Sequence, residues 1–413
     1  MQTRTRAGYR ARLSLSLRPR IAFAVAVEET AAVARQTTQA PKVSVVIPCL
    51  NEAENIEQCV KLAQETLREH GIPGEVIVAD NGSEDGSAEL ARAAGANVVE
   101  EPRRGYGSAY LAGFAGARGD YIIMIDADLT YDFADIPRFV RELDAGADLV
   151  MGDRMDNIEP GAMPWLNRHV GNPLLSGFLN MLFKTGVHDA HCGMRAFRRD
   201  TLPRLDLRTT GMEFASEMII RASKAGLDIR EFPIRLGLRR GESKLSPLRD
   251  GWRHLRLILV YSPNFLFLVP GVASVALGIL IIVTVLTKLT VFGRQFFIHA
   301  EIAGSLMIIV GIEMVALGLI ARTYGVYFMG ERDAFLERVR ARLKLEHGLL
   351  VGGSLILVGL VGGSISIAIW ASQGFGTLGE GEFALGAATL FIAGVQIFFT
   401  SFLLSILGLR RPP

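Results

Sequence analysis

Four long apolar stretches in the second half of the chain constrain its fold more than any other feature. Three of them contain no charged residue, and the fourth contains only Glu313. They are residues 262–287, 302–321, 348–379 and 383–409. Because about 20 apolar residues cross the hydrocarbon core of a bilayer as a helix, each stretch is long enough to span it. The sequence therefore predicts a membrane domain, residues 262–409, with four transmembrane helices, and it excludes a wholly soluble protein.

The basic residues of the connecting segments predict the orientation of these helices. The connector after the second stretch and the end of the chain are rich in them: Arg332, Arg338, Arg340, Arg342, Lys344, Arg410 and Arg411. The connector after the first stretch holds Lys288 and Arg294, and the connector after the third holds no Lys or Arg. Since Lys and Arg are retained on the cytoplasmic side, we expect a multi-pass protein of the cell membrane. Its N-terminal part and its C-terminus would both be cytoplasmic.

The N-terminal half has a different pattern, in which short apolar runs alternate with helical segments. The expected strands are residues 43–47, 75–79, 97–99, 121–125 and 148–151. The expected helices are one capped by Asn51 and ending near His70, and residues 87–94, 108–117 and 136–145. Such alternation is typical of a mainly parallel sheet with a ligand crevice at the carboxyl ends of its strands. Residues 42–247 are therefore expected to form a cytosolic α/β domain.

Charge and cysteine content exclude two further classes of protein. The 44 Lys+Arg and 42 Asp+Glu residues give a net charge of +2, without the basic excess of nucleic-acid-binding proteins. The three scattered cysteines, Cys49, Cys59 and Cys192, exclude a disulfide framework and indicate a reducing compartment. Residues 1–40 form a basic tail that we expect to be disordered. The alternative, a cleaved signal peptide, would export the α/β domain.

A helix is expected at residues 248–261, directly before the first apolar stretch. Two side-chain stripes follow helical spacing there, one of Arg249, Arg253 and Arg256 and one of Leu248, Trp252, Leu255 and Leu259. A helix with adjacent basic and apolar stripes is suited to the headgroup layer of a membrane. An ordinary surface helix of the α/β domain is the alternative.

Two carboxylates, Asp126 and Asp128, follow the apolar run 121–125. Residues two apart in a strand point to the same side, so both are expected at the mouth of the crevice. Carboxylate oxygens there can hold Mg²⁺ or Mn²⁺, which would neutralise a diphosphate leaving group. An acidic surface turn is the alternative, but the apolar run before the pair makes a buried strand the better interpretation.

Two other functional classes remain open at this point. Asp126, Asp128 and Thr130 also match the DxDxT pattern of haloacid-dehalogenase-type phosphatases, in which the first Asp is a nucleophile. That interpretation ranks lower because no lysine lies between Thr130 and Gly152 and because much of the α/β domain precedes the pattern. A non-catalytic membrane anchor or translocation protein would instead depend on the spans. Glu313 is then either functional or part of a helix–helix hydrogen bond.

Eight short motifs of the N-terminal half occur in an order that resembles a known family. They are residues 45–56 (VVIPCLNEAENI), 78–87 (VADNGSEDGS), 103–107 (RRGYG), 126–128 (DAD), 152–154 (GDR), 189–195 (DAHCGMR), 213–217 (EFASE) and 240–244 (RGESK). Together they resemble family 2 glycosyltransferases, and within these the polyprenyl (dolichyl)-phosphate mannose/glucose synthases, over about residues 42–256. The resemblance implies a Rossmann-like GT-A domain, in a branch that often carries C-terminal transmembrane helices.

The resemblance also implies a reaction and a donor site. The reaction would be an inverting transfer of a hexose from GDP-mannose or UDP-glucose to polyprenyl phosphate, with Mg²⁺ or Mn²⁺ at Asp126 and Asp128. The nucleotide would lie against Pro48, Asn51, Glu52, Asp80 and Asn81. Relatives commonly have Asp at Asn81 and often have Gln at Thr130. These departures put in question the share of Asn81 in nucleotide recognition and a third protein ligand to the metal.

On the acceptor side, the resemblance places Asp189 near the lipid phosphate. A phosphate monoester is mostly ionised at neutral pH, so it can attack the anomeric carbon without a strong base. Asp189 is then expected to orient the site, and catalysis to rest on alignment and charge stabilisation. Cations expected to bind the acceptor phosphate are Arg154, Arg168, Arg195, Arg240 and Lys244.

The remaining expectations concern partners and other ligands. Membrane lipid, the nucleotide sugar and the lipid acceptor are the expected partners, nucleic acid is not expected, and a homo-oligomer is left open. His188 and His191 flank Asp189, but a zinc site is not expected because no further His cluster accompanies them.

Overall fold

The computed structural model describes residues 40–240, 247–290, 295, 297–329, 333–342, 344–375 and 381–408. Predictions that concern residues 1–39, Lys244, Arg294, Arg332, Arg410 and Arg411 lie outside the described residues. The chain divides into two compact units, Met1–Leu257 and Ile258–Pro413, and each is described by itself.

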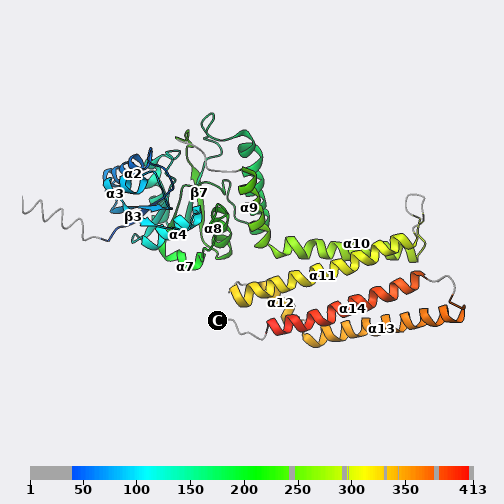
Figure 1. Cartoon of the computed structure of the whole chain (residues 1–413). Helices are drawn as coiled ribbons and strands as arrows, with labels where there is room; N and C mark the ends of the chain where they lie inside the picture. The colour runs from blue at the N-terminus through cyan, green and yellow to red at the C-terminus, as the bar shows by residue number, and fades with distance from the viewer. Residues whose placement is uncertain are drawn as a thin grey trace, which may run out of the picture. The chain divides into compact units, whose positions relative to one another are not determined.

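One seven-stranded sheet, with the order β3-β2-β1-β4-β6-β5-β7, forms the centre of the first unit (Figure 1). Its strands are β1 (Val43–Cys49), β2 (Gly74–Asp80), β3 (Asn97–Glu100), β4 (Tyr121–Met124), β5 (Leu149–Asp153), β6 (Arg195–Arg198) and β7 (Ile229–Pro233). All neighbours are parallel except β6, which is antiparallel to both β4 and β5. The prediction of a mainly parallel α/β sheet is confirmed. The sequence did not predict β6, because Arg-Ala-Phe-Arg contains no apolar run.

Helices cover both faces of this sheet because its central strands are apolar on both sides (Figure 1). Val43, Val45 and Ile47 of β1 belong to one buried cluster with α2 (Ile56–Glu69) and α5 (Ile136–Asp144). On the other face, Gly113 lets its helix approach β1 so closely that an added Cβ would overlap Val46. The other α-helices described in this unit are α3 (Ser87–Ala93), α4 (Tyr106–Gly116), α6 (Asn172–Phe183), α7 (Leu202–Leu205) and α8 (Phe214–Lys224). A further helix, α9 (Pro247–Val260), begins in this unit and ends in the second.

The predicted helix cap at Asn51 is wrong. The helix begins only at Ile56, and Asn51 lies in the preceding loop with a φ of +52°. The Asn51 backbone N–H donates to Ser83 Oγ at 3.0 Å, and its Oδ1 accepts from the backbone N–H of Glu84 at 2.8 Å. Asn51 therefore joins the loop after β1 to the loop after β2. This link lies at the carboxyl edge of the sheet, where the candidate site is expected.

Within its described residues, the second unit contains four helices that are long and apolar enough to span a membrane, as predicted. These spans are Asn264–Leu286, which includes α10 (Val269–Leu286), Ile298–Tyr327 within α11 (Ile298–Met329), α13 (Leu345–Ser372) and α14 (Gly381–Leu407). A short helix, α12 (Ala334–Arg342), lies between the second and third spans. Glu313 accepts a hydrogen bond from Gln396 Nε2 at 3.2 Å, so it takes part in a helix–helix contact between α11 and α14.

Glycines bring the membrane helices together in two pairs, α10 with α11 and α13 with α14 (Figure 1). An added Cβ on Gly278 would lie 2.5 Å from the carbonyl oxygen of Gly304, and one on Gly304 would lie 2.9 Å from that of Gly278. Gly352 and Gly394 approach each other in the same way in the second pair. Small residues thus allow backbone-to-backbone packing where lipid offers no hydrophobic driving force.

Candidate active site

Polar residues from distant parts of the chain meet at the carboxyl edge of the sheet. Asp80 ends β2, and Asp126 and Asp128 follow β4 directly. The backbone N–H of Asn81 donates to the carbonyl oxygen of Cys49 at the end of β1, at 2.8 Å. Because β1, β2 and β4 are neighbouring parallel strands, their carboxyl ends lie together at one edge of the sheet, which is where folds of this class place a ligand crevice.

Asp126 lies at this edge of the sheet, where its contacts keep the carboxylate in one place. Its Oδ1 accepts hydrogen bonds from the hydroxyls of Tyr106 at 3.1 Å and Tyr110 at 3.3 Å. Its Oδ2 lies against Gly193, where an added Cβ would overlap it. Burial, with a further contribution from the charge of Asp128, raises the pKa of Asp126 to about 6.

Asp128 presents one carboxylate oxygen to the crevice. Its Oδ1 accepts from the backbone N–H of Thr130 at 3.1 Å and from Thr130 Oγ1 at 2.6 Å. Its Oδ2 faces Arg239, whose Nη1 lies 3.4 Å away. Thr130 therefore occupies Oδ1 of Asp128 with hydrogen bonds and leaves Oδ2 available to a ligand.

These residues fit a hard divalent cation. Two carboxylates follow the end of one buried strand, and carboxylate oxygens are the ligands that such ions prefer in proteins. Among the residues that the structure describes, no group of three or more His, Cys, Asp or Glu side chains could hold a metal. Asp126 and Asp128 would therefore hold the ion by two ligands, with oxygens of the substrate and water completing its shell, as is common for Mg²⁺.

Asp80 carries a buried acceptor that finds no donor in the described chain. Its side chain is only 6 % exposed, and its Oδ2 accepts from the backbone N–H groups of Gly82 and Ser83, each at 3.2 Å. Its Oδ1 is buried without a hydrogen bond. An unpaired buried carboxylate oxygen is costly, and a base or ribose N–H or O–H would satisfy it.

Asn81 has a different role from the predicted nucleotide contact. Its Nδ2 donates to the carbonyl oxygens of Glu101 and Arg103, and its Oδ1 accepts from the backbone N–H of Gly105 at 2.6 Å. With these bonds the amide holds the loop 101–105 against the end of β2. Pro48 is half-buried near the end of β1 and Glu52 follows this strand, and Arg239 Nη2 lies 3.4 Å from Glu52 Oε1.

Arg154 and Asp189 form a buried bidentate ion pair beside the carboxylates. Arg154 Nε donates to Asp189 Oδ2 at 2.6 Å and Nη2 donates to Oδ1 at 2.8 Å, while Nη1 reaches the hydroxyl of Tyr131 at 3.2 Å. Although burial opposes it, the Arg154 guanidinium lowers the pKa of Asp189 below its ordinary value. Asp189 is fully buried. The Tyr131 hydroxyl also accepts from the backbone N–H of Gly193 at 2.7 Å, so the pair is tied to the residue that confines Asp126.

The predicted acceptor cations are not all available to a ligand. Arg195 is 1 % exposed and donates to the carbonyl oxygens of Ala190, Cys192 and Ala215, so its prediction as a phosphate ligand is wrong. Its guanidinium instead shapes the loop that bears Asp189. Arg168 is half-buried in the helical turn η2 (Asn167–Gly171), and the exposed Arg240 donates to Gln58 Oε1 at 3.2 Å.

The structure adds residues that the sequence did not single out. Tyr106, Tyr110 and Tyr131 contact Asp126 or its neighbours, and Arg239 lies between Glu52 and Asp128. Tyr106 lies within the motif 103–107, and Arg239 directly precedes the motif 240–244. Their position in or next to these motifs is the sequence signal that could have identified them. The imidazoles of His188 and His191 contact different partners, Asp153 Oδ2 and Ser216 Oγ.

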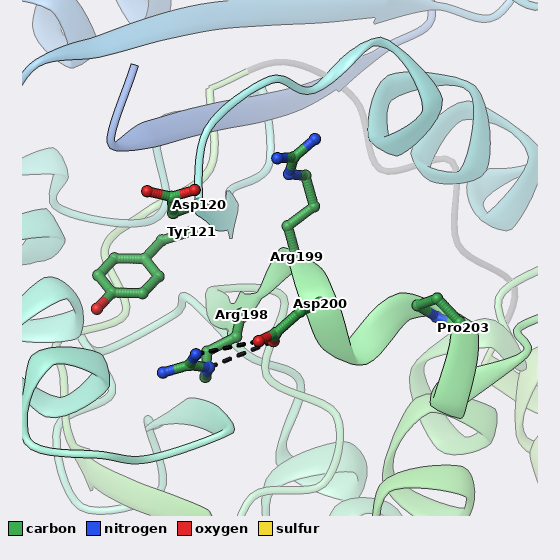
Figure 2. Close-up of a pocket in the computed structure, with 6 residues that line it drawn as sticks. All are labelled: Asp120, Tyr121, Arg198, Arg199, Asp200 and Pro203. Carbon is green, nitrogen blue, oxygen red and sulfur yellow. Dashed lines mark hydrogen bonds and ion pairs between the residues drawn. The ribbon is translucent and has the colours of Figure 1, made fainter. Parts of the chain in front are cut away.

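A separate pocket lies at the opposite end of the sheet. It has a volume of about 400 Å³ and is lined by Asp120, Tyr121, Arg198, Arg199, Asp200 and Pro203 (Figure 2). Tyr121 begins β4, whereas Asp126 follows its end, so this pocket is not part of the candidate site. Arg198 and Asp200 pair with each other at 3.0 Å.

Two family models match this chain. Residues 44–205 match glycosyl transferase family 2, and residues 319–408 match the C-terminal transmembrane region of family 2 glycosyltransferases. The low-salt glycan biosynthesis hexosyltransferase Agl6 of Haloferax volcanii is 42% identical over 371 residues, which cover 89% of this chain and 90% of Agl6. The dolichyl-phosphate hexose transferase of the same organism is 38% identical over 178 residues, 42% of this chain and 75% of that one.

A weaker similarity joins the chain to a solved structure. Glucosyl-3-phosphoglycerate synthase from Mycobacterium tuberculosis, in complex with Mn²⁺, UDP-glucose and phosphoglyceric acid, is 25% identical with a TM-score of 0.45. The match covers 54% of this chain and 80% of that one. The family assignment rests instead on the sequence matches, and it leaves the phosphatase and the non-catalytic anchor without support. The chain is a membrane protein that belongs to glycosyltransferase family 2, with a GT-A domain followed by the family's transmembrane region.

Proposed function

We propose that this enzyme transfers a hexose from a nucleotide sugar, GDP-mannose or UDP-glucose, to polyprenyl phosphate with inversion, at the cytoplasmic face of the membrane and with Mg²⁺ or Mn²⁺. The observation that carries this proposal is the convergence of Asp80, Asp126 and Asp128 on one crevice of a chain that also has four apolar spans. The names of two relatives, a hexosyltransferase and a dolichyl-phosphate hexose transferase, support the sugar class and the acceptor class.

Asp80 is the proposed anchor for the nucleoside. Its buried, unpaired Oδ1 would accept a hydrogen bond from the base or the ribose. Glu52 and Pro48 lie at the same edge and would line the pocket. Asn51 and Asn81 would support the nucleoside site indirectly, because both hold the loops around Asp80 in place.

Asp126 and Asp128 would hold the divalent cation, which when bound stabilises negative charge on the diphosphate leaving group. The Tyr106 and Tyr110 hydroxyls keep Asp126 oriented, and Thr130 turns Asp128 so that its Oδ2 faces the crevice. Because these contacts exist before substrate binds, the enzyme has little reorganisation to make during the reaction.

An exposed apolar face that runs along η2 and α6 is an argument for a lipid acceptor. Large side chains are exposed along it: Trp165, Leu166, Val170, Leu174 and Met181. Leu166, Val170 and Leu174 recur every four residues and so share one helix face. Exposed apolar stripes of this kind are typical of surfaces that meet membrane or lipid. Arg168 lies in the same helical turn and would meet the phosphate of an amphiphilic acceptor.

The proposed reaction is a direct displacement at the anomeric carbon. An ionised oxygen of the acceptor phosphate forms a bond to this carbon, and the bond from the carbon to the donor diphosphate breaks with its electron pair leaving on the nucleoside diphosphate. Attack from the opposite side inverts the configuration. The Arg154–Asp189 pair would position the loop that bears Asp189, since the two side chains already bind each other.

The test is sugar transfer in membranes that contain the protein. Labelled GDP-mannose and UDP-glucose are supplied separately with polyprenyl phosphate, with and without EDTA, and organic-extractable label is measured. We expect label from one donor, its loss with EDTA, and a loss of at least about 100-fold in Asp128→Asn, because a displaced metal ion removes several kcal/mol of charge stabilisation. Asp200→Asn, at the opposite end of the sheet, is the matched control and should retain activity. Equal label in wild type and Asp128→Asn would contradict the proposal.

A further inference from the structure

Arg239 lies between two carboxylates of the candidate site. Its Nη1 is 3.4 Å from Asp128 Oδ2, and its Nη2 is 3.4 Å from Glu52 Oε1. Its Nε is buried and finds no hydrogen-bond partner among the described residues. The side chain is 26 % exposed, so the guanidinium is shielded but still reachable from the crevice.

The guanidinium faces the same carboxylate oxygen that a cation would need. Asp128 Oδ1 is occupied by two hydrogen bonds from Thr130, whereas Oδ2 faces Arg239. A divalent cation at Asp128 would bind Oδ2, the oxygen that Thr130 leaves available. Arg239 and the cation therefore compete for one atom.

The contact is weak enough to be displaced. Charge-assisted hydrogen bonds are typically 2.7–2.9 Å long, as the nearby Arg154–Asp189 pair shows with 2.6 and 2.8 Å, but both Arg239 contacts are 3.4 Å. The backbone next to Arg239 is held independently of its side chain. The Arg240 N–H donates to the carbonyl oxygen of Asp128 at 3.3 Å, and Asn55 Nδ2 donates to the carbonyl oxygen of Arg240 at 3.1 Å.

We propose that Arg239 is the resident counter-ion of the cation site, and that a divalent cation must displace its guanidinium from Asp128 Oδ2 in order to bind. This inference rests on the proposed function, because it takes Asp128 as a cation ligand. Before the cation arrives, Arg239 offsets the repulsion between Asp128 and Glu52. Once it is displaced, the backbone contacts keep it beside the site, so exchange needs only a side-chain movement.

The experiment measures Mn²⁺ binding to the purified full-length protein in detergent, without nucleotide or acceptor, from the electron paramagnetic resonance signal of free Mn²⁺. Arg239→Met removes the competing charge and keeps a long side chain, and it should lower the Kd for Mn²⁺ by about tenfold, the order expected when one partly screened unit charge is removed nearby. Arg239→Lys keeps the charge but loses the two-pronged geometry, so its Kd should fall between those of wild type and Arg239→Met.

Arg240→Met is the matched control, because the neighbouring Arg240 side chain contacts Gln58 instead of Asp128. Its Kd for Mn²⁺ should stay within about twofold of wild type, since its charge is more exposed and screened. Circular dichroism of each variant shows whether it is folded. An unchanged or higher Kd in folded Arg239→Met and Arg239→Lys would overturn the inference.

The two proposals fail in different ways. If wild type binds Mn²⁺ and Asp128→Asn does not, the cation site stands, and the Arg239 variants alone decide this inference. If wild type and Asp128→Asn bind Mn²⁺ equally, the cation site of the proposed function fails, and the inference fails with it.

Discussion

At the level of single residues, the buried pair of Arg154 and Asp189 has a clear energetic consequence. Asp189 is fully buried and Arg154 is 8 % exposed, so neither charge is well solvated. Three hydrogen bonds from Arg154 to Asp189, one of them from its backbone N–H, compensate for this loss. Removing one member leaves the other charged, buried and unpaired, which costs more than the pair itself contributes.

We therefore expect Arg154→Met to lower the free energy of unfolding by about 3–5 kcal/mol. The double variant Arg154→Met/Asp189→Asn should recover part of this loss, because no buried charge remains, but it should not recover sugar transfer. Chemical denaturation in detergent measures the first effect and the labelled-donor assay the second.

Arg198→Met is the control for this prediction, because it breaks the exposed pair with Asp200. It should cost less than about 1 kcal/mol. If Arg154→Met cost no more than Arg198→Met, the buried pair would not be the stabilising contact that its geometry indicates.

Individual residues also show where sequence reasoning reached its limit. Asp80 and Asn81 are adjacent and polar, and both follow an apolar run, so the sequence treats them alike. Alternation along the chain sends their side chains to different surroundings: Asp80 keeps a free buried oxygen, whereas Asn81 is fully used by the loop 101–105. The prediction of Arg195 as a phosphate ligand has a similar limit. Its charge suggests a ligand, and only the assembled fold shows that its buried guanidinium donates to backbone carbonyl oxygens.

At the level of elements, the membrane helices depend on glycine contacts. Gly359 of α13 lies against α14 so closely that an added Cβ would be 2.6 Å from the backbone nitrogen of Phe391. Gly363, one turn later, has nothing within 4 Å of the same point. These two glycines differ in packing but share one helix, which makes them a matched pair for substitution.

Gly359→Leu should destabilise the α13–α14 pair by about 1–3 kcal/mol or more, because the backbones must separate to admit the side chain. Gly363→Leu brings the same change in helix propensity without a backbone contact to disrupt, so it should not destabilise the α13–α14 pair. The apparent Tm of the detergent-solubilised protein compares the two variants. Equal apparent Tm values would mean that close approach of α13 and α14 does not stabilise the membrane unit.

At the level of the whole molecule, the proposed orientation places the α/β unit and the connector around α12 on the cytoplasmic side, and the connector after α10 outside. The described chain offers an exposed residue in each connector, Arg338 and Thr290. The native cysteines, Cys49, Cys59 and Cys192, are all buried and should give little background with thiol reagents.

A cysteine introduced by Thr290→Cys should react with a membrane-impermeant maleimide in intact cells. One introduced by Arg338→Cys should react only after the cells are permeabilised, because positive connectors stay inside. Mass-tagged maleimide and a gel shift measure both. The opposite result would reverse the orientation and place the α/β unit away from cytoplasmic nucleotide sugars.

The sequence by itself determined the features that depend on local pattern. Apolar length predicted the four spans, and alternation of short strands and helices predicted the mainly parallel sheet. Two carboxylates after a buried strand placed the candidate cation ligands at its end. Each of these follows from the period or length of a single segment.

Only the tertiary structure decided which polar groups meet and which are already satisfied. The contact of Tyr106 with Asp126 joins side chains 20 residues apart, and that of Arg239 with Glu52 joins side chains 187 residues apart. Local periodicity holds no information on such distances, because chain topology alone sets which strand ends become neighbours. For the same reason the antiparallel strand β6 and the buried roles of Arg195 and Asn81 appeared only once the sheet was assembled.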